Sequence, residues 1–306
     1  MTTLVFGHKS PDTDSTGSPL IWAWYLNEVK GGKAEAVLLG EPGTEAAFML
    51  DRWDIPKPRI ITDVEDGQPC VVVDTNNPAE LPDNINGADV QAIIDHHKLV
   101  GGLETRGPIT ITIRPLACSA TLIVDLMGPD AEAMPDWAKG AALTCILSDT
   151  LEFRSPTTTA RDRNVAEGLA HALGIDIASY AAEMFAAKSD VSAFTDAELL
   201  RMDSKQYDVA DKSFRVSVLE TTAPDIVLAR KTTLMNAMRD VAAEDGVDQV
   251  LLFVVDILKE EATLLVPNEL VKAVAEKSFG ARVTEDTVVL PGIMSRKKQI
   301  IPNLTL

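Results

Sequence analysis

Short apolar runs alternate with segments of helical pattern through the first half of the chain, and this alternation restricts the possible folds. The runs at residues 4–6, 70–74 and 90–95 are apolar at nearly every position. Such strands are buried on both faces, as in a parallel sheet whose connections are helices. We therefore expect an α/β fold with a mostly parallel sheet flanked by helices. Strands are expected at 4–6, 36–39, 60–61, 70–74, 90–95 and 109–113, and helices at 16–29, 44–53, 120–127, 137–147, 158–173 and 177–187.

A polar, weakly patterned stretch separates this half from a second set of apolar runs. With 306 residues, the chain is long enough for two domains that each bury a core. We expect a larger N-terminal domain at residues 1–188, a linker at 189–194 and a smaller C-terminal α/β domain at 195–306. Strands of the second domain are expected near 207 and at 214–219, 249–256 and 263–266, and helices at 225–244 and 270–277.

Composition excludes several classes of protein. The formal net charge is −18, which argues against a large nucleic-acid surface because phosphate backbones require a basic footprint. The longest apolar run, 250–255, is much shorter than a membrane span. A strand begins at once, so we expect no signal peptide. Cys70, Cys118 and Cys145 are odd in number and lie in apolar segments, which indicates reduced thiols and the cytoplasm.

Histidine and aspartate cluster directly after two of the expected strands. Residues 7–15 read GHKSPDTDS and carry His8, Asp12 and Asp14, and the strand at 90–95 ends in Asp95-His96-His97. The chain has only four histidines, and three of them lie in these two places. Ligands bind at the carboxyl ends of strands in parallel sheets, and imidazole with carboxylate is a ligand set for divalent metals. The sequence therefore predicts a metal site at this edge.

Two further aspartates belong to the same expected edge. Asp74 ends the run at 71–73, and Asp149 follows an apolar helical segment. Taken singly, Asp14 and Asp149 could be helix caps or turn formers, Asp74 a turn residue, and His8 an ordinary loop histidine. Together they form a carboxylate cluster that would repel itself without cations. Two histidines and four aspartates are enough for two ions if some carboxylates bridge.

These motifs resemble those of the DHH phosphoesterase superfamily, and a basic C-terminal motif narrows the resemblance to the manganese-dependent, family II inorganic pyrophosphatases. The resemblance covers both expected domains. One departure is that Thr75 stands where the family often has histidine. The motifs are Gly7-His8-x-x-Pro11-Asp12-x-Asp14-Ser15, Asp74, Asp95-His96-His97, Ser148-Asp149-Thr150 and Ser295-Arg296-Lys297-Lys298-Gln299.

The resemblance implies two metal sites that share carboxylates, with Asp95 orienting a histidine of the triplet. Mixed imidazole and carboxylate ligands suit Mn²⁺ or Co²⁺ better than Mg²⁺. We expect two or more Mn²⁺ ions per subunit, with Co²⁺ as a possible substitute and Mg²⁺ entering with the substrate. The implied ligands are His8, Asp12, Asp74 and Asp149 for one ion, and Asp14, Asp74, His96 and Asp149 for the other.

The resemblance also implies a substrate site for inorganic diphosphate. His97 would face the substrate and donate a proton or hydrogen bond to the leaving phosphate. Adjacent residues of an extended segment point to opposite sides, so His97 need not bind the metal that His96 binds. The expected catalytic residues are His97, Asp12 and Asp149, and the expected substrate-binding residues are His97, Lys205, Arg296 and Lys297.

The basic residues have a simpler alternative reading. Arg296 to Lys298 could be a solvated charge run, although it is conspicuous in so acidic a chain. Lys205 could be an ordinary surface lysine, and Lys298 could belong to either class. Arginine forks match phosphate oxygens, whereas lysine supplies a point charge.

The reaction implied is hydrolysis of diphosphate to two orthophosphates, with a metal-bridging hydroxide as nucleophile. The alternatives are a short-chain exopolyphosphatase or another DHH-superfamily phosphoesterase. A non-catalytic metal-binding protein is a further alternative, but no ligand of the motifs is missing. The resemblance also implies a homodimer, with no nucleic-acid or membrane partner.

Overall fold

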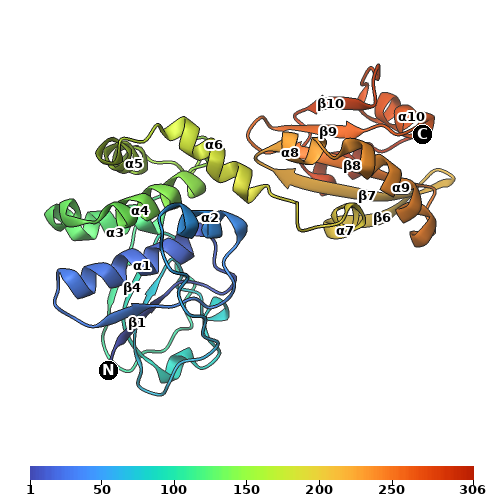
Figure 1. Ribbon diagram of the computed structural model, residues 1–306. Helices are drawn as coiled ribbons and strands as arrows, with labels where there is room; N and C mark the ends of the chain where they lie inside the picture. Colours follow the sequence, from blue (N-terminus) through green and yellow to red (C-terminus); the bar gives the residue numbers. More distant parts are fainter. The chain divides into compact units, whose positions relative to one another are not determined.

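The computed structural model describes all residues, Met1 to Leu306, and divides the chain into two compact units. Unit 1 comprises Met1–Ala187 and unit 2 comprises Lys188–Leu306. Each unit is built around its own five-stranded sheet (Figure 1). Every strand of unit 1 comes from the first part of the chain, drawn in blue to green, and every strand of unit 2 from the last part, drawn in yellow to red.

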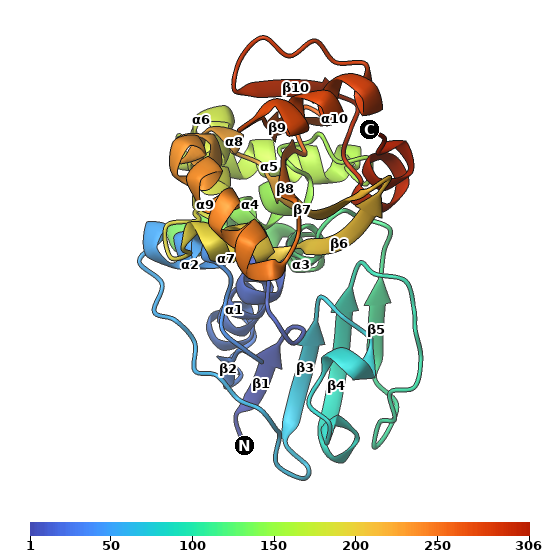
Figure 2. The ribbon, with the colours of Figure 1, turned by 90° about the vertical axis from the view of Figure 1, so that its right-hand side faces the viewer.

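The sheet of unit 1 has the strand order β2-β1-β3-β4-β5, and all four neighbouring pairs are parallel. Figure 2 shows β1, β3, β4 and β5 side by side with their arrowheads at the same end. The predicted mostly parallel sheet is therefore confirmed. The strands are β1 (Thr3–Phe6), β2 (Ala34–Ala36), β3 (Pro69–Val73), β4 (Asp89–Asp95) and β5 (Thr110–Ile113).

Helices cover the sheet of unit 1 and pack on one another. Helices α1 and α3 contact the strands, and α4 packs against α1. The approach of α1 to α4 is close: a Cβ atom on Gly17 would lie 2.4 Å from the Cys145 sulfur, so only glycine fits there. The helices are α1 (Thr13–Glu28), α2 (Thr44–Arg52), α3 (Ser119–Met127), α4 (Asp136–Asp149), α5 (Ala160–Leu173) and α6 (Ile177–Lys188).

Residues of strands β1, β3 and β4 form a hydrophobic core cluster with residues from the irregular segments of unit 1. Phe6 of β1, Val72 of β3 and Val90 of β4 belong to this cluster, together with Leu81 and Ile85. Leu81 and Ile85 lie at the short 3₁₀ helices η1 (Pro78–Glu80) and η2 (Ile85–Gly87). In β1 and β3 the cluster uses alternate positions, because side chains alternate along a strand. Strand β4 contributes Val90 and Ile93, which lie on either side of a register shift.

Unit 2 has a mixed sheet with the order β10-β9-β8-β7-β6. The β7–β8 pair is parallel and the other three pairs are antiparallel. Every residue of the central strand β8 is buried. No helix in the structure combines the length and apolar character needed to span a membrane. The elements are β6 (Ser204–Val209), β7 (Lys212–Thr221), β8 (Gln249–Asp256), β9 (Glu261–Leu265), β10 (Thr287–Pro291), α7 (Asp196–Met202), α8 (Pro224–Leu228), α9 (Lys231–Asp245), α10 (Glu269–Phe279), and the short helices η4 (Arg296–Ile300) and η5 (Ile301–Asn303).

Several predicted elements differ from the structure. The strands expected at 36–39 and 60–61 are reduced to β2 and one isolated bridge between Leu38 and Ile60. The helix expected at 225–244 is two helices, α8 and α9. Helix α7 and strand β10 were not predicted, although Thr195 and Glu198 form a capping box that marks the start of α7.

Candidate metal centre

The first histidine–aspartate motif lies between β1 and α1. Asp12 is the N-cap of α1, and its carboxylate accepts a hydrogen bond of 2.9 Å from the Ser15 N–H. The helix begins at Thr13, three residues earlier than predicted, because this cap satisfies the first free N–H groups. Asp14 therefore projects from the first helical turn rather than from a loop. His8 and Asp12 lie near each other, with 3.5 Å between Nε2 and Oδ2.

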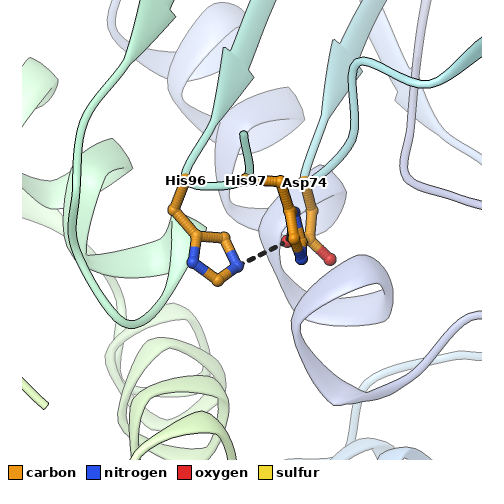
Figure 3. A group of neighbouring side chains, drawn as sticks. All are labelled: Asp74, His96 and His97. Atoms are coloured by element: carbon orange, nitrogen blue, oxygen red, sulfur yellow. Dashed lines mark ion pairs between the residues drawn. The ribbon is translucent and has the colours of Figure 1, made fainter. Parts of the chain in front are cut away.

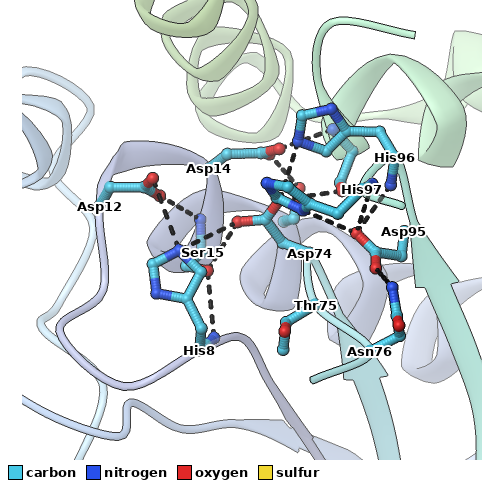
Figure 4. A network of polar contacts seen from close by, with 12 residues as sticks. His8, Asp12, Asp14, Ser15, Asp74, Thr75, Asn76, Asp95, His96 and His97 are labelled. Atoms are coloured by element: carbon cyan, nitrogen blue, oxygen red, sulfur yellow. Dashed lines mark hydrogen bonds and ion pairs between the residues drawn. The ribbon is translucent and has the colours of Figure 1, made fainter. Parts of the chain in front are cut away.

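Asp74 occupies the centre of the site. It follows β3, has a φ of +57° and is almost fully buried. Left-handed backbone is uncommon for residues other than glycine, and such positions concentrate at functional sites. The His8 Nε2 lies 3.6 Å from Asp74 Oδ2, and the His96 Nε2 lies 3.3 Å from Asp74 Oδ1 (Figure 4). The carboxylate therefore stands between the two histidines.

The two adjacent histidines lie on the same side of the chain, so the argument that strand alternation separates them is wrong. Their ring centroids are 4.1 Å apart, and both rings lie beside Asp74 (Figure 3). Strand β4 ends at Asp95, and the chain bends at His97. The alternation of an extended strand therefore no longer applies. His97 Nδ1 is 3.9 Å from Asp74 Oδ1 but only 2.9 Å from Asp95 Oδ1.

Backbone carbonyls orient the rings of His8 and His96. The Nδ1 of His8 lies 2.8 Å from the carbonyl oxygen of Lys9, and the Nδ1 of His96 lies 3.1 Å from that of Leu116. An N–H at Nδ1 donates to each carbonyl, so Nε2 is directed toward the carboxylates. This tautomer is the one that presents Nε2 to a metal ion.

Asp14 is almost fully buried, and the partly buried Asp149 lies beside it. Ligand atoms of Asp14, Asp149 and His96 lie within 4.8 Å of one another. Burial, reinforced by the charge of Asp74, raises the pKa of Asp14 to about 7. Burial and the charge of Asp14 raise the pKa of Asp149 well above its ordinary value. The Oδ2 atom of Asp149 is buried without a hydrogen-bond partner.

Residues outside the predicted set hold Asp14 and Asp74 in place. The Ser15 hydroxyl donates to Asp74 Oδ2 at 2.6 Å, and the Ser119 hydroxyl donates to Asp74 Oδ1 at 3.1 Å. The backbone N–H groups of Ser119 and Ala120, at the start of α3, donate to Asp14 at 2.6 and 3.2 Å. Ser15 belongs to the quoted first motif, but no local signal singled out Ser119.

A second network supports His97. The Asn76 amide donates to Asp95 Oδ2 at 2.6 Å, and Asp95 Oδ1 lies beside His97 Nδ1. The hydrogen bond that His97 donates to the Asp95 carboxylate raises the pKa of His97. Thr75, at the position where the resemblance suggested histidine, is buried and donates to Glu80 Oε2 at 2.6 Å. The Thr75 hydroxyl therefore holds the side chain of Glu80.

The cluster has the composition and geometry of a site for divalent cations. An unpaired buried oxygen on Asp149 and a pKa raised to about 7 for Asp14 show that the nearby histidine does not fully compensate these carboxylates. Ligand atoms of Asp74 lie close to those of His8 and also to those of His96, whereas the ligand atoms of Asp149 lie close to those of His96 but not of His8. The three groups of ligand atoms within 4.8 Å are Asp74, His96 and His97; His8, Asp12 and Asp74; and Asp14, His96 and Asp149.

The basic residues expected to bind substrate lie in unit 2. Arg296 is mostly buried and bonds the Asp203 carbonyl at 2.7 Å and its carboxylate at 2.8 Å. Asp203 immediately precedes β6, which carries the exposed Lys205, so the two cationic segments are joined. Lys297 is exposed in η4. The Gln299 side chain accepts from the N–H groups of the preceding loop at 2.9 Å and thereby shapes it.

The metal-free site is expected to release protons when it binds a divalent cation. Burial lowers the pKa of His8 and of His96, but hydrogen bonds to Asp12 and Asp74 and the nearby negative charge raise both to about 9. Ligation requires neutral imidazole and ionised carboxylate. Calorimetric titration with Mn²⁺ at pH 7.5, in buffers of different ionisation enthalpy, should therefore show net proton release. Binding should tighten as the pH rises toward 9. Identical heats in all buffers would contradict the protonated site.

The same groups make the stability of the metal-free fold depend on pH. A pKa raised to about 9 means that each histidine stabilises the fold fully below its ordinary pKa of about 6.5, and that this contribution is lost as the pH rises through 9. The raised pKa of Asp14 acts in the same direction, up to about pH 7. With a chelator present, the midpoint of thermal unfolding should fall between pH 6.5 and 9. Saturating Mn²⁺ should reduce that fall.

Comparison with family models covers nearly the whole chain. Residues 2–148 match the DHH family, N-terminal domain, and residues 182–306 match the DHHA2 domain. An exopolyphosphatase-related protein of Bacteroides fragilis has 12% identity and a TM-score of 0.50 over 98% of this chain and 89% of its own, a similarity of fold alone.

Closer similarity is found to pyrophosphatases. Two curated relatives carry the name "Probable manganese-dependent inorganic pyrophosphatase". The one from Lactiplantibacillus plantarum is 37% identical over 99% of this chain and 97% of its own. The one from Deinococcus radiodurans is 38% identical over 98% and 96%. A Methanococcus jannaschii crystal structure, described as a family II inorganic pyrophosphatase, has a TM-score of 0.63 and 32% identity over 99% of this chain and 98% of its own. The chain belongs to the family of manganese-dependent, family II inorganic pyrophosphatases.

Proposed function

We propose that the chain hydrolyses inorganic diphosphate to two orthophosphates at the site around Asp74. The observation that carries the proposal is the cluster of two histidines and four aspartates around the buried Asp74, all from the motifs of the family. Bound divalent cations would lower the pKa of a water molecule and offset phosphate charge. The protein supplies the ligands, their orientation and the groups that move protons.

Two Mn²⁺ ions fit the ligand set, with Co²⁺ as a possible substitute and Mg²⁺ entering with the substrate. Asp74 is well placed to be shared, because its two oxygens face His8 and His96. We assign His8, Asp12, Asp74 and Asp149 to one ion and Asp14, Asp74, His96 and Asp149 to the other. The Asp149 oxygen that has no hydrogen-bond partner supports Asp149 as a metal ligand. Ligand atoms of Asp149 lie close to those of Asp14 and His96, which favours the ion that these two residues hold.

His97 is the group best suited to give a proton to the leaving phosphate. Its Nδ1 is held by Asp95, while half of the side chain remains exposed. The hydrogen bond to Asp95 raises the pKa of the imidazole, which favours the protonated form that a general acid requires. Asp12 and Asp149 are proposed to be catalytic through the ions that they hold.

The cations of unit 2 are proposed to bind the substrate phosphates. Arg296 and Lys205 lie on segments joined through Asp203. An arginine fork and lysine point charges complement diphosphate oxygens and stabilise charge that develops during transfer. Lys297, exposed next to Arg296, completes the proposed set.

A substrate comparison tests the function and separates it from its nearest rival. We expect phosphate release from diphosphate to be faster than from triphosphate or longer polyphosphate, and absent from a dinucleotide. Each substrate would be assayed with Mn²⁺ and with Mg²⁺, and we expect Mn²⁺ to support the higher rate. Faster cleavage of long polyphosphate would show instead a short-chain exopolyphosphatase, and cleavage of the dinucleotide another phosphoesterase.

A homodimer in the cytoplasm is proposed as the working state. Strand β5 pairs only with β4, and its Ile111 is 52% exposed, so this edge is open to a second copy. The three cysteines are free and buried, which suits a reducing compartment. Sedimentation of the purified protein would give its oligomeric state, and a monomer at micromolar concentration would contradict the proposal.

A further inference from the structure

A buried carboxylate outside the ligand set links two parts of the site. Glu45 lies in the first turn of α2 and is only 6% exposed. One of its oxygens, Oε2, accepts hydrogen bonds from the Thr13 hydroxyl at 3.0 Å and from the Ser148 hydroxyl at 2.7 Å. Both hydroxyls are themselves buried. A single oxygen therefore joins the start of α1 to the end of α4.

The two hydroxyls belong to neighbours of the proposed metal ligands. Thr13 lies between Asp12 and Asp14, and Ser148 immediately precedes Asp149. The carboxylates of Asp14 and Asp149 reach the same group of ligand atoms, with His96, within 4.8 Å. The relative position of α1 and α4 thus sets the spacing of these two carboxylates, and Glu45 connects the residues beside them.

Glu45 adds hydrogen bonds to an interface between α1 and α4 that other contacts also hold. The packing of α1 on α4 has other support: the Cys145 thiol donates to the Thr13 carbonyl at 3.3 Å, and Gly17 lies against the same sulfur. The helices can therefore pack without Glu45.

We propose that Glu45 is a positioning residue of the metal centre, which fixes the spacing of Asp14 and Asp149 through Thr13 and Ser148. The inference rests on the proposed function only in using the same site. Groups that orient metal ligands typically contribute about 10- to 100-fold to metal affinity. Glu45 acts one residue away from the ligands, through two hydrogen bonds.

Metal binding tests this role without reference to diphosphate. We expect Glu45→Ala to weaken Mn²⁺ binding about 10-fold or more in calorimetric titration, and to alter the visible absorption of the Co²⁺-loaded protein, which reports ligand geometry. Glu45→Gln keeps an oxygen that accepts both hydroxyls, so it should restore most of the affinity. The matched control is Glu41→Ala, because Glu41 is exposed and pairs with Lys57 at the surface.

A double-mutant cycle tests the route of action. If Glu45 acts through Ser148, Glu45→Ala combined with Ser148→Ala should weaken Mn²⁺ binding no more than Glu45→Ala alone. The proposal would be overturned if the two substitutions multiplied each other's effect on Mn²⁺ affinity. It would also be overturned if Glu45→Ala changed neither the Mn²⁺ affinity nor the spectrum of the Co²⁺-loaded protein. If Glu45→Ala fails to fold, Mn²⁺ binding is measured in Glu45→Gln and Ser148→Ala instead. A Mn²⁺ affinity of Ser148→Ala equal to that of wild type would overturn the proposal. Wild-type protein that binds Mn²⁺ but leaves diphosphate intact would refute the proposed function and not this inference.

Discussion

Replacing Asp74 with asparagine is expected to abolish diphosphate hydrolysis, with a loss of at least about 10³-fold in kcat, beyond what removal of a single oxyanion donor costs. Asp74 lies between His8 and His96, and its two oxygens face them separately. Asparagine has one oxygen, no charge and an NH₂ group that cannot ligate a cation. The variant should also lose at least one equivalent of Mn²⁺ in metal analysis.

The same variant should weaken the dependence of metal-free stability on pH. The Asp74 charge raises the pKa values of His8, His96 and Asp14. Removing that charge lowers all three, so the midpoint of thermal unfolding should fall less between pH 6.5 and 9 than it does in wild type. Thermal unfolding in the presence of a chelator checks this point. The control is Asp51→Asn, at an exposed position of α2. Full metal occupancy with normal activity in the Asp74 variant would refute the assignment.

The second large effect is expected from His97→Gln, which should lower kcat by about 10²- to 10⁴-fold, as for a general acid. Glutamine keeps a hydrogen-bond donor but cannot transfer a proton. Because a general acid must be protonated, the limb of the pH profile that falls at alkaline pH should flatten. Metal content should stay unchanged. Loss of a metal equivalent would show that His97 is a ligand, a result that its position beside Asp74 makes necessary to test.

Asp95→Asn provides an independent check on His97. The Asp95 carboxylate raises the pKa of His97 through a hydrogen bond. An asparagine keeps the contact but removes the charge, so the alkaline limb of the profile should move to lower pH. Activity that keeps its wild-type pH profile in this variant would show that His97 does not control the limb.

Arg296→Ala should behave differently from the histidine variant. Its guanidinium is proposed to meet substrate both before and during transfer, so the variant should raise KM and also lower kcat, with unchanged metal content. Arg282→Ala is the matched control, since Arg282 is an exposed arginine of the same unit. Wild-type kinetics in Arg296→Ala would show that the basic run from Arg296 to Lys298 is solvated surface.

The sequence by itself determined the class of fold and the chemistry of the site. Apolar runs that are buried on both faces predict the parallel sheet of unit 1, because only strands covered on both sides can be apolar throughout. The polar residues that end those runs must then gather at one edge. The roles of the six ligands, of His97 and of the basic residues stay predictions that the variants above test.

Only the tertiary structure decided how the side chains meet. Ser119 bonds Asp14 across 105 positions of sequence, Ser15 bonds Asp74 across 59, and Glu45 bonds Ser148 across 103. Such contacts leave no local pattern, because they depend on where separate elements pack. The orientation of His97 has the same origin. Strand alternation ends with β4. Beyond it, the N–H groups of His96 and His97 bond the Asp95 carboxylate, and the side chain of Asn76, from another segment, bonds the backbone at residues 98 and 100.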